Sequence, residues 1–310
     1  MYNVQRFIDG LLRSYDRYVR IPAAQHRFRH IHILTSEESI RYIIDHRCSV
    51  SRFGDGEFFV MMGKGNGFQQ PDACLAERLK EVILNENETL RYENENYIIK
   101  HLVAIPLPLK DTSRLRPSSK EFWGYFSLRY WEELLPLLST ERTYLDTQLS
   151  RFYMMYEDKS GAQHQLQLLK QIWDNRDIVI IEGCQSRTGV GNDLYENARS
   201  IKRILGPATN AFSKYTEMLN AITDNVTKDK LILLSYGMTA TILAYDLARM
   251  GYWAIDIGHL DIEYEWMRMG ATDNVPVMGK FTNEAVGGNH VDSVYSSQYL
   301  SQIITDITTK

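Results

Sequence analysis

The sequence predicts an α/β protein built around a mainly parallel sheet with helices on its faces. Short runs rich in β-branched and other apolar residues alternate with longer segments whose apolar residues recur every three or four positions. This alternation is typical of βαβ units, in which a helix returns the chain to a parallel neighbouring strand. No internal repeat or low-complexity tract interrupts the pattern. We therefore expect an architecture that binds a nucleotide at its strand ends.

Five short runs have the length and composition of buried strands. They are Ser49 to Phe53, Ile98 to Ile105, Asp177 to Glu182, Lys230 to Ser235 and Trp253 to Ile257. Seven further segments have helical spacing of apolar residues. They are Glu37 to Asp45, Asp72 to Asn85, Lys120 to Leu138, His164 to Asn175, Asp193 to Ile204, Lys214 to Thr223 and Thr239 to Met250. The proline-containing segment from 106 to 119 is expected to be an irregular loop.

Length and composition fit one large domain with a small addition at each end. A chain of 310 residues that is 44% apolar and 24% charged can bury a large core without disulfide or metal crosslinks. We expect an N-terminal arm at residues 1–35, a main domain at 36–285 and a C-terminal appendage at 286–310. The appendage is rich in Ser and Thr and shows little periodicity.

Charge and hydropathy exclude some classes of partner. The formal net charge of −4 argues against a nucleic-acid partner, because binding to nucleic acid needs an excess of Lys and Arg. No run reaches the roughly 18 apolar residues of a membrane span, and the N-terminus lacks the pattern of a signal peptide. Three scattered cysteines suit a reducing compartment. We therefore expect a cytoplasmic protein.

The N-terminal arm is predicted to contain a basic amphipathic helix. Between Val4 and Val19, five apolar residues recur at helical spacing and arginines lie between them. One interpretation is a helix that packs on its own domain or on a second copy in a homodimer. The other is peripheral contact with a membrane through residues 1–20.

The first segment that indicates chemistry is Arg52-Phe53-Gly54-Asp55-Gly56-Glu57, where a strand is expected to end. Its two glycines allow a tight turn around the acids, so Asp55 and Glu57 are expected to share a confined loop. Carboxylate oxygens suit Mg²⁺ or Mn²⁺, which bridges such groups to a substrate phosphate. Arg52, Gly54 and Asp55 are also candidates for contact with the phosphate. The alternative is a solvated turn, because acid-x-acid is common by chance.

A second segment runs from Glu182 to Asp193, after the strand expected at 177–182. If a helix begins at Asp193, the glycine-containing loop and the helix N-terminus form an anion site, because free N–H groups and the helix dipole favour phosphate. Leu194 stands where the dinucleotide fingerprint needs its third glycine, which argues against a nicotinamide or flavin cofactor. The candidate diphosphate contacts in this segment are Ser186, Arg187, Gly189, Gly191 and Asn192.

A third segment repeats the order of strand, glycine turn and helix between residues 230 and 247. Ligands of open α/β sheets lie outside the carboxyl ends of the strands. Gly237 and Thr239 are therefore expected to face the same crevice as Arg187 and Gly189. The alternative is an ordinary structural turn.

The fourth segment, from Asp256 to Trp266, is acidic and aromatic and follows a predicted buried strand. If a helix starts at Asp261, Asp261 and Glu265 share one face, and one of them is expected to point toward the crevice as a base. The alternative is that His259, in the same segment, is structural and that the acids only complement the helix dipole. Position after a strand favours function, so His259 and Glu265 are the catalytic candidates.

Three of these segments together resemble the bacterial glycosyltransferases of the GT-D fold, which are DUF1792-like proteins. The matching segments are Arg52 to Glu57, Ser186 to Leu194 and Asp256 to Trp266. The resemblance spans roughly residues 37–284, and the order of the segments is its specific part. It implies a single Rossmann-like domain with a DXE motif, matched here by Asp55 and Glu57. In that family the motif engages a divalent metal, Mn²⁺ or Mg²⁺, and the diphosphate of a UDP-sugar.

The resemblance also implies a reaction. A hexose, glucose before galactose, would pass from the UDP-sugar donor to a glycan or glycoprotein acceptor in glycoprotein or surface polysaccharide biosynthesis. His259 and Glu265 fall where the family carries functional residues near the acceptor. Glu265 would be the general base of an inverting reaction, or would orient the acceptor in a retaining one. The alternatives are a nucleotide-dependent α/β enzyme of another class and a non-catalytic module that binds nucleotide-sugars.

Overall fold

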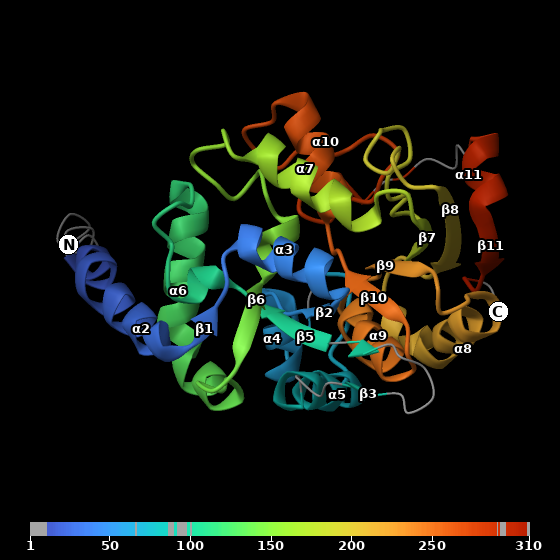
Figure 1. Ribbon diagram of the computed structural model, residues 1–310. Helices are drawn as coiled ribbons and strands as arrows, with labels where there is room; N and C mark the ends of the chain where they lie inside the picture. The colour runs from blue at the N-terminus through green and yellow to red at the C-terminus, as the bar shows by residue number, and fades with distance from the viewer. Residues whose placement is uncertain are drawn as a thin grey trace.

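The computed structural model describes residues 11–65, 67–85, 90–91, 98–99, 101–289, 291 and 296–308. Within these residues nine strands form one sheet (Figure 1), in which every neighbouring pair is parallel. Its order is β1 (His32–Ile33), β6 (Thr143–Asp146), β5 (His101–Ile105), β2 (Ser49–Arg52), β10 (Trp253–Asp256), β9 (Leu231–Ser235), β7 (Asp177–Gly183), β8 (Ser200–Gly206) and β11 (Ile303–Asp306). A separate antiparallel pair joins β3 (Leu90–Arg91) to β4 (Ile98–Ile99). The predicted α/β fold with a mainly parallel sheet is confirmed.

Local signals set where several helices begin. The side chain of Thr35 accepts the N–H of Glu38 before α3, and Asp72 accepts the N–H of Leu75 before α5. Pro117 stands at the first position of α6, where a missing N–H has no cost. The helices are α2 (Ile21–Arg27), α3 (Ser36–His46), α4 (Asp55–Met61), α5 (Ala73–Leu84), α6 (Pro117–Leu134), α7 (Ala162–Trp173), α8 (Tyr215–Asn225), α9 (Met238–Arg249), α10 (Leu260–Met269) and α11 (Ser297–Gln302).

Alternate side chains of the central strands enter separate cores on the two faces of the sheet. Ile178 and Ile180 of β7 pack with α3, α7 and α10, whereas Val179 and Ile181 pack with α8 and α9. At the β5 side, α4, α5 and α6 share a core with α9. Figure 1 shows α3, α7 and α10 on one side of the sheet and α4, α5, α8 and α9 on the other. Both faces are covered, and the central strands β9 and β10 are accordingly apolar except for their last residues, whereas β2 buries two serines and Arg52.

Most of the predicted elements are confirmed. Four predicted strands appear as β2, β7, β9 and β10 with ends shifted by at most one residue. The predicted strand from Ile98 to Ile105 is observed as β5 together with the short β4, and residue 100 between them lies outside the described residues. Six of the seven predicted helices are present. The loop expected at 106–119 contains a short 3₁₀ turn at Leu107–Leu109, and α6 begins within it.

The helix predicted from Asp193 to Ile204 is wrong. This part of the chain forms an irregular segment followed by β8, which pairs with β7 along all of its residues. Arg203 of β8 is buried and forms an ion pair of 2.6 Å with the buried Glu182 of β7. Leu194 and Tyr195, which suggested helical spacing, enter the core beside α7 from an irregular backbone. Strand pairing and burial therefore override the local pattern.

Both ends of the described chain contribute to the sheet. β11 pairs with β8 at one edge, although it lies in the tail that was expected to be an appendage after residue 285. β1 pairs with β6 at the other edge, although it lies within the arm expected at 1–35. The predicted boundaries at 35 and 285 therefore do not separate the sheet from its ends.

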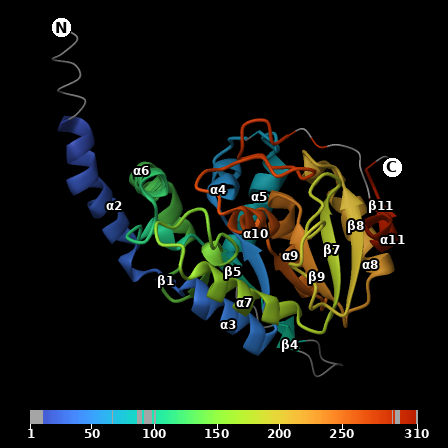
Figure 2. The same cartoon turned by 90° about the horizontal axis from the view of Figure 1, so that it is seen from above.

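The N-terminal arm is helical from residue 11 through α2, and residues 1–10 of the predicted helix lie outside the described residues. Figure 2 shows α2 beside α6, with the arm extending away from the domain. Gly124 of α6 leaves room for Ile21, since a Cβ there would lie 3.0 Å from the Ile21 side chain. Among the described residues, no helix combines the length and apolar character that a membrane span requires. The arm exposes the apolar side chains of Leu11, Leu12, Tyr15, Tyr18 and Val19.

Candidate active site

A cavity of about 670 Å³ opens at the carboxyl ends of the central strands. Its wall includes residues that directly follow β2, β7, β9 and β10. The chain leaves β7 toward β8 and leaves β9 toward β10, in opposite directions along the sheet. Ligands of open α/β sheets bind at such a switch point. The cavity is therefore the candidate active site.

Asp55 and Glu57, the predicted metal ligands, both line this cavity. They do not lie in a loop, as expected, but in the first turn of α4. Glu57 Oε2 accepts a hydrogen bond of 2.7 Å from Gly54 N and so caps the helix. Burial raises the pKa of Asp55, and burial together with the Asp256 carboxylate raises the pKa of Glu57 to about 7. A bound cation would offset both effects, because a nearby positive charge favours the ionised carboxylate.

Arg52 crosses the end of β10 and reaches Asp256. Arg52 Nη1 lies 3.5 Å from Asp256 Oδ1. Gly258 makes this path available, because a Cβ at Gly258 would lie 1.8 Å from Arg52 Nη1 and its φ is +48°. Burial raises the pKa of Asp256 to about 6, although Arg52 opposes the rise. Arg52 thus brings positive charge to the edge of the cavity nearest Asp55.

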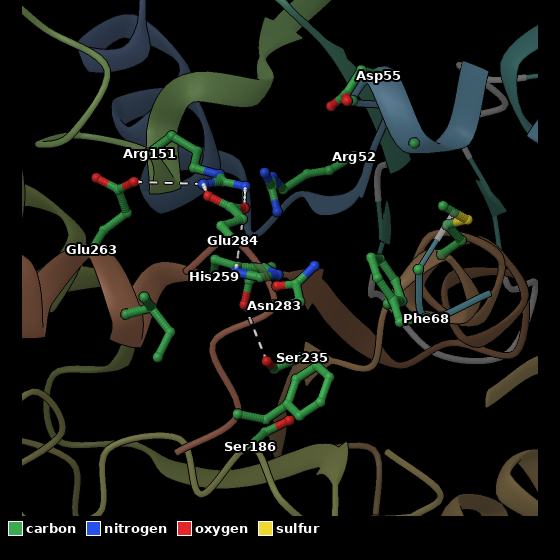
Figure 3. A pocket seen from close by; sticks show the side chains of 18 of the residues that line it. Arg52, Asp55, Phe68, Arg151, Ser186, Ser235, His259, Glu263, Asn283 and Glu284 are labelled. Atoms are coloured by element: carbon green, nitrogen blue, oxygen red, sulfur yellow. Dashed lines mark hydrogen bonds and ion pairs between the residues drawn. The ribbon is translucent and has the colours of Figure 1, made fainter. Parts of the chain in front are cut away.

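A cluster of charged residues occupies the middle of the cavity (Figure 3). Arg151 binds Glu284 through both terminal nitrogens, and the Nη1 to Oε2 distance is 2.8 Å. Arg151 Nη1 also lies 3.6 Å from Glu263 Oε1. His259 Nδ1 is 3.6 Å from Glu284 Oε1. The cluster therefore joins three parts of the chain. They are the loop after β6, the start of α10 and the irregular segment between α10 and α11.

The cluster fixes the charge of its members. Burial lowers the pKa of His259 to about 4 despite the opposing Glu284, so the imidazole is neutral at pH 7. Burial alone would raise the pKa of Glu284, but the Arg151 charge holds it at about 2. Burial raises the pKa of Glu263, which is fully buried, although Arg151 opposes the rise. His259 is therefore a neutral imidazole beside the ionised Glu284.

The wall at the ends of β7 and β9 carries hydroxyl groups and backbone. Ser186, Ser235 and Gly237 line the cavity there. Figure 3 places Ser186 and Ser235 on the side of the cavity opposite Arg151, and Phe68 at the right of the view, below Asp55. The Phe68 ring lies 3.2 Å from the position of a Cβ on Gly237, and its carbonyl accepts the N–H of Asn210. This wall offers small polar groups and one aromatic ring.

Seven residues predicted from sequence line the cavity, namely Arg52, Gly54, Asp55, Glu57, Ser186, Gly237 and His259. Six others do not, namely Arg187, Gly189, Gly191, Asn192, Thr239 and Glu265. Arg187 Nη1 donates to Gly279 O at 2.9 Å, and Thr239 is fully buried. Gly189, with φ +74°, allows the close approach of Tyr195, whose Cδ2 would lie 2.4 Å from an added Cβ. The helix N-terminus expected to bind phosphate near Asn192 is absent.

Glu265, the predicted base, is engaged outside the cavity. Its Oε1 accepts hydrogen bonds from Asn192 at 2.7 Å and from Lys280 at 3.2 Å. Lys280 is buried and also donates to Asp261 Oδ2 at 2.6 Å. Glu265 and Asn192 therefore help to anchor the segment that contains Lys280, and this segment continues into the cavity at Glu284. The geometry assigns Glu265 an anchoring position.

A family model described as "Glycosyltransferase GT-D fold" matches residues 50–285, which is most of the chain. The chain belongs to the GT-D glycosyltransferase family. The resemblance stated from the sequence is thereby confirmed, and the sheet described above is the GT-D fold of this chain.

Two curated relatives of this GT-D glycosyltransferase come from streptococci. It is 38% identical over 271 residues to "Glycosyltransferase GlyD" of Streptococcus pneumoniae serotype 4 (strain ATCC BAA-334 / TIGR4). The matched region covers 87% of this chain and 32% of the relative. It is 34% identical over 289 residues to "Probable glycosyl transferase Gly" of Streptococcus gordonii, which covers 93% of this chain and 40% of the relative. The chain thus spans about a third to two fifths of the length of the curated relatives it matches.

Solved structures agree with this family. One, described as "The highly conserved domain of unknown function 1792 has a distinct glycosyltransferase fold", has 36% identity and a TM-score of 0.84, covering 92% of this chain and 98% of that one. Another, described as "A New Glycosyltransferase (DUF1792) from Streptococcus sanguinis", has 35% identity and a TM-score of 0.82, covering 90% of this chain and all of that one. Both extend over almost the whole GT-D chain.

Five charged residues of this GT-D site were not assigned from the sequence: Arg116, Arg151, Asp256, Glu263 and Glu284. Asp256 is the last residue of β10 and Glu263 stands in the acidic segment after it, so position at a strand end was a usable signal. Arg151 follows β6, which was not predicted, and Glu284 lies in a segment without regular structure. No local pattern marks these two residues.

Glu265→Gln should leave the turnover of this glycosyltransferase within about a factor of three of the wild type. The glutamine oxygen can still accept from Lys280 and Asn192, and the side chain lies outside the cavity. The expected cost is a lower Tm, because Lys280 loses one of its two anionic partners. Nucleotide release and thermal unfolding check both statements. A hundredfold loss of turnover at unchanged Tm would return Glu265 to the role of base.

Proposed function

We propose that this chain transfers a hexose, with glucose as the first choice, from a UDP-sugar to a glycan acceptor in a metal-dependent reaction. The observation that carries the proposal is the position of Asp55 and Glu57 on the wall of a cavity at the switch point of the sheet. A UDP-sugar has a nucleoside, a diphosphate and a hexose. The cavity offers a wall with suitable chemistry for each part.

The nucleoside and the diphosphate fit the side formed by the ends of β7 and β9. Ser186 and Ser235 supply hydroxyl groups there, and Gly237 leaves space near the backbone. The Phe68 ring supplies a face on which a uracil base can stack. From this side the diphosphate would reach Asp55 at the end of β2. In the sheet, β10 lies between β2 and β9.

The residues present fit a divalent cation that is shared with the donor. Six carboxylates and three guanidinium groups line the cavity among the described residues, which leaves an excess of negative charge. In the described part of the chain, the protein by itself offers no group of three or more His, Cys, Asp or Glu side chains that could hold a metal ion. Asp55 and Glu57 would therefore hold Mn²⁺ or Mg²⁺ together with phosphate oxygens and water, as is usual for such ions. When bound, the ion supplies Lewis-acid stabilisation of charge on the leaving diphosphate.

The chain's own groups would share the rest of the chemistry. Arg52 and Arg151 present guanidinium groups to the cavity, where they can bind phosphate oxygens as negative charge develops. His259 is neutral at pH 7 and can accept the proton of an acceptor hydroxyl. Glu284, 3.6 Å from His259 Nδ1, would stabilise the imidazolium so formed. We therefore propose His259 in place of Glu265 as the proton acceptor.

The wider context follows from the family resemblance. We propose a glycan or glycoprotein acceptor in glycoprotein or surface polysaccharide biosynthesis. Contact of the arm with a second copy or with a membrane surface remains a proposal, supported by its exposed apolar side chains and by Arg13, Arg17 and Arg20. A cytoplasmic location remains a prediction from the sequence.

Release of nucleotide from a panel of UDP-, GDP- and CMP-sugars, with Mn²⁺ or with EDTA, tests the proposed function. We expect release from one UDP-hexose with Mn²⁺ and none with EDTA. Equal release with EDTA would contradict metal dependence, and release only from another nucleotide would contradict the UDP assignment. Tight binding of a nucleotide-sugar without release, in the presence of every acceptor tried, would instead favour a non-catalytic binding module.

Binding of Mn²⁺ in the presence of UDP should tighten as the pH rises from 6 to 8. The pKa of Glu57 is about 7, so the fraction of ionised carboxylate rises through this range, and only the ionised form is a good ligand. Calorimetric titration at several pH values measures the slope, and Glu57→Gln should flatten it. An affinity that is independent of pH in the wild type would contradict ligation by Glu57.

A further inference from the structure

The cavity extends beyond the proposed donor site to a wall that comes from α6. This wall includes Arg116, Ser118, Ser119, Phe122 and Trp123. Figures 1 and 2 both place α6 near β1, whereas β7 and β8 lie at the other end of the sheet. None of the groups proposed above for the metal, the diphosphate or the nucleoside comes from α6. This end of the cavity therefore has no role in the binding of those parts of the donor.

Phe122 gives the α6 wall an exposed but supported aromatic ring. Its side chain is 45% exposed although it lines the cavity. The ring stacks on Phe126, with centroids 6.0 Å apart and an angle of 28°, and meets Trp123 edge-on at 5.3 Å. Trp123 and Phe126 are buried and hold the ring from behind. Such a ring can pack against the apolar face of a pyranose without first being ordered.

In the part of the chain that the structure describes, two amide oxygens without hydrogen-bond partners line the cavity outside α6. Gln148 and Asn283 both line the cavity, and their side-chain oxygens are buried without a hydrogen-bond partner among the described residues. Leaving a buried amide oxygen unpaired costs free energy. Hydroxyl groups of a ligand would remove that cost by donating to both oxygens. An apolar platform combined with unpaired acceptors is the chemistry that recognises a saccharide.

The direction of the donor leads to the same end of the cavity. The nucleoside is proposed at β7 and β9, and the diphosphate near Asp55 at the end of β2, so the hexose lies farther along the sheet toward β6. An acceptor hydroxyl must reach the anomeric carbon within about 3–3.5 Å for reaction. No part of the donor is proposed to bind at the α6 wall, which leaves this wall for the acceptor.

We propose that the α6 wall is the acceptor subsite and that it takes a saccharide, whose ring packs on Phe122 and whose hydroxyls donate to Gln148 and Asn283. This inference rests on the proposed function, which places the donor on the opposite wall. In the reaction, the acceptor oxygen forms a bond to the anomeric carbon of the hexose. The bond from that carbon to the UDP oxygen breaks, UDP leaves with the electron pair, and His259 takes the hydroxyl proton.

Transfer to p-nitrophenyl glycosides of glucose, galactose, N-acetylglucosamine and N-acetylgalactosamine tests the subsite. Phe122→Ala should raise the KM for the accepted glycoside about tenfold, a loss of the size expected for one aromatic contact, while the KM for the UDP-sugar changes by less than about twofold. Phe122→Tyr keeps an aromatic ring and should have the wild-type KM for the glycoside. Leu84→Ala removes an apolar side chain of equal exposure, 46%, outside the cavity and should change neither constant.

The outcomes separate the subsite from the function on which it rests. A second variant, Phe122→Leu, keeps an apolar contact with Phe126 and loses only the ring, so it is less prone to a folding defect. The KM of this variant for the glycoside should also rise. An unchanged acceptor KM in both variants overturns the role of Phe122. Nucleotide release without transfer to any glycoside overturns the saccharide assignment and leaves the donor reaction standing. Absence of release from every UDP-sugar removes the proposed function, and the subsite with it.

Discussion

Asp55→Asn and Glu57→Gln should each reduce metal-dependent nucleotide release by about 10²–10³-fold. Each change removes one negative charge from the wall of the cavity and keeps nearly the same shape. The proposed cation is balanced by these two carboxylates, so the loss of either weakens both its binding and its contact with the diphosphate. Nucleotide release at saturating donor, measured across a range of Mn²⁺ concentrations, gives the size of the effect.

Glu57→Gln is the sharper of the two variants. Glutamine can still accept the hydrogen bond from Gly54 N, so α4 keeps its cap and the Tm should change little. Asp45→Asn, which removes an exposed carboxylate of α3 outside the cavity, is a matched control and should behave as the wild type. Turnover above about a tenth of the wild-type rate in either site variant would argue against a catalytic metal at these residues.

Arg151→Met should destabilise the folded chain by about 3–5 kcal/mol and remove turnover. Glu284 and the fully buried Glu263 would lose the positive charge that faces them, and the cavity would lose one of the groups proposed to bind phosphate. Chemical denaturation measures the stability, and nucleotide release measures the activity. Arg151→Lys keeps the charge but cannot form the two-nitrogen contact with Glu284, so an intermediate effect is expected.

The pH dependence of the Arg151 effect has a definite sign. In the wild type the pKa of Glu284 is held at about 2, below its ordinary value of 4.5, so its ionised form stabilises the fold above 4.5 and this contribution is lost as the pH falls toward 2. Without Arg151, burial raises this pKa above 4.5, and the variant should gain stability on acidification from pH 7 to pH 5. A difference in stability between variant and wild type that is equal at pH 5 and pH 7 would contradict this account.

The strands that end at the cavity could be predicted from the sequence because each is a short buried run that ends in polar or glycine residues. β2, β7, β9 and β10 therefore appeared at the expected positions. Since the carboxyl ends of parallel strands meet at one edge, side chains far apart in sequence, such as Asp55, Ser186 and His259, could be assigned to a single cavity.

Residues whose position depends on tertiary contacts could not be predicted in this way. Helical spacing correctly put Asp261 and Glu265 on one face, but it could not reveal Lys280, which comes from a later irregular segment and forms ion pairs with both. The helix expected from Asp193 to Ile204 failed because pairing with β7 decides the conformation of that segment. Arg151 owes its position to a turn after the unpredicted β6, and it reached the site without any local signal.

A crystal structure of the chain with UDP and Mn²⁺, with the metal located by its anomalous scattering, tests the central claim most directly. The account predicts one Mn²⁺ at about 2.1 Å from a carboxylate oxygen of Asp55 or Glu57 and from oxygens of the diphosphate, with the uridine over the ends of β7 and β9. UDP bound in another part of the chain, or bound in this cavity with Mn²⁺ away from both carboxylates, would contradict it.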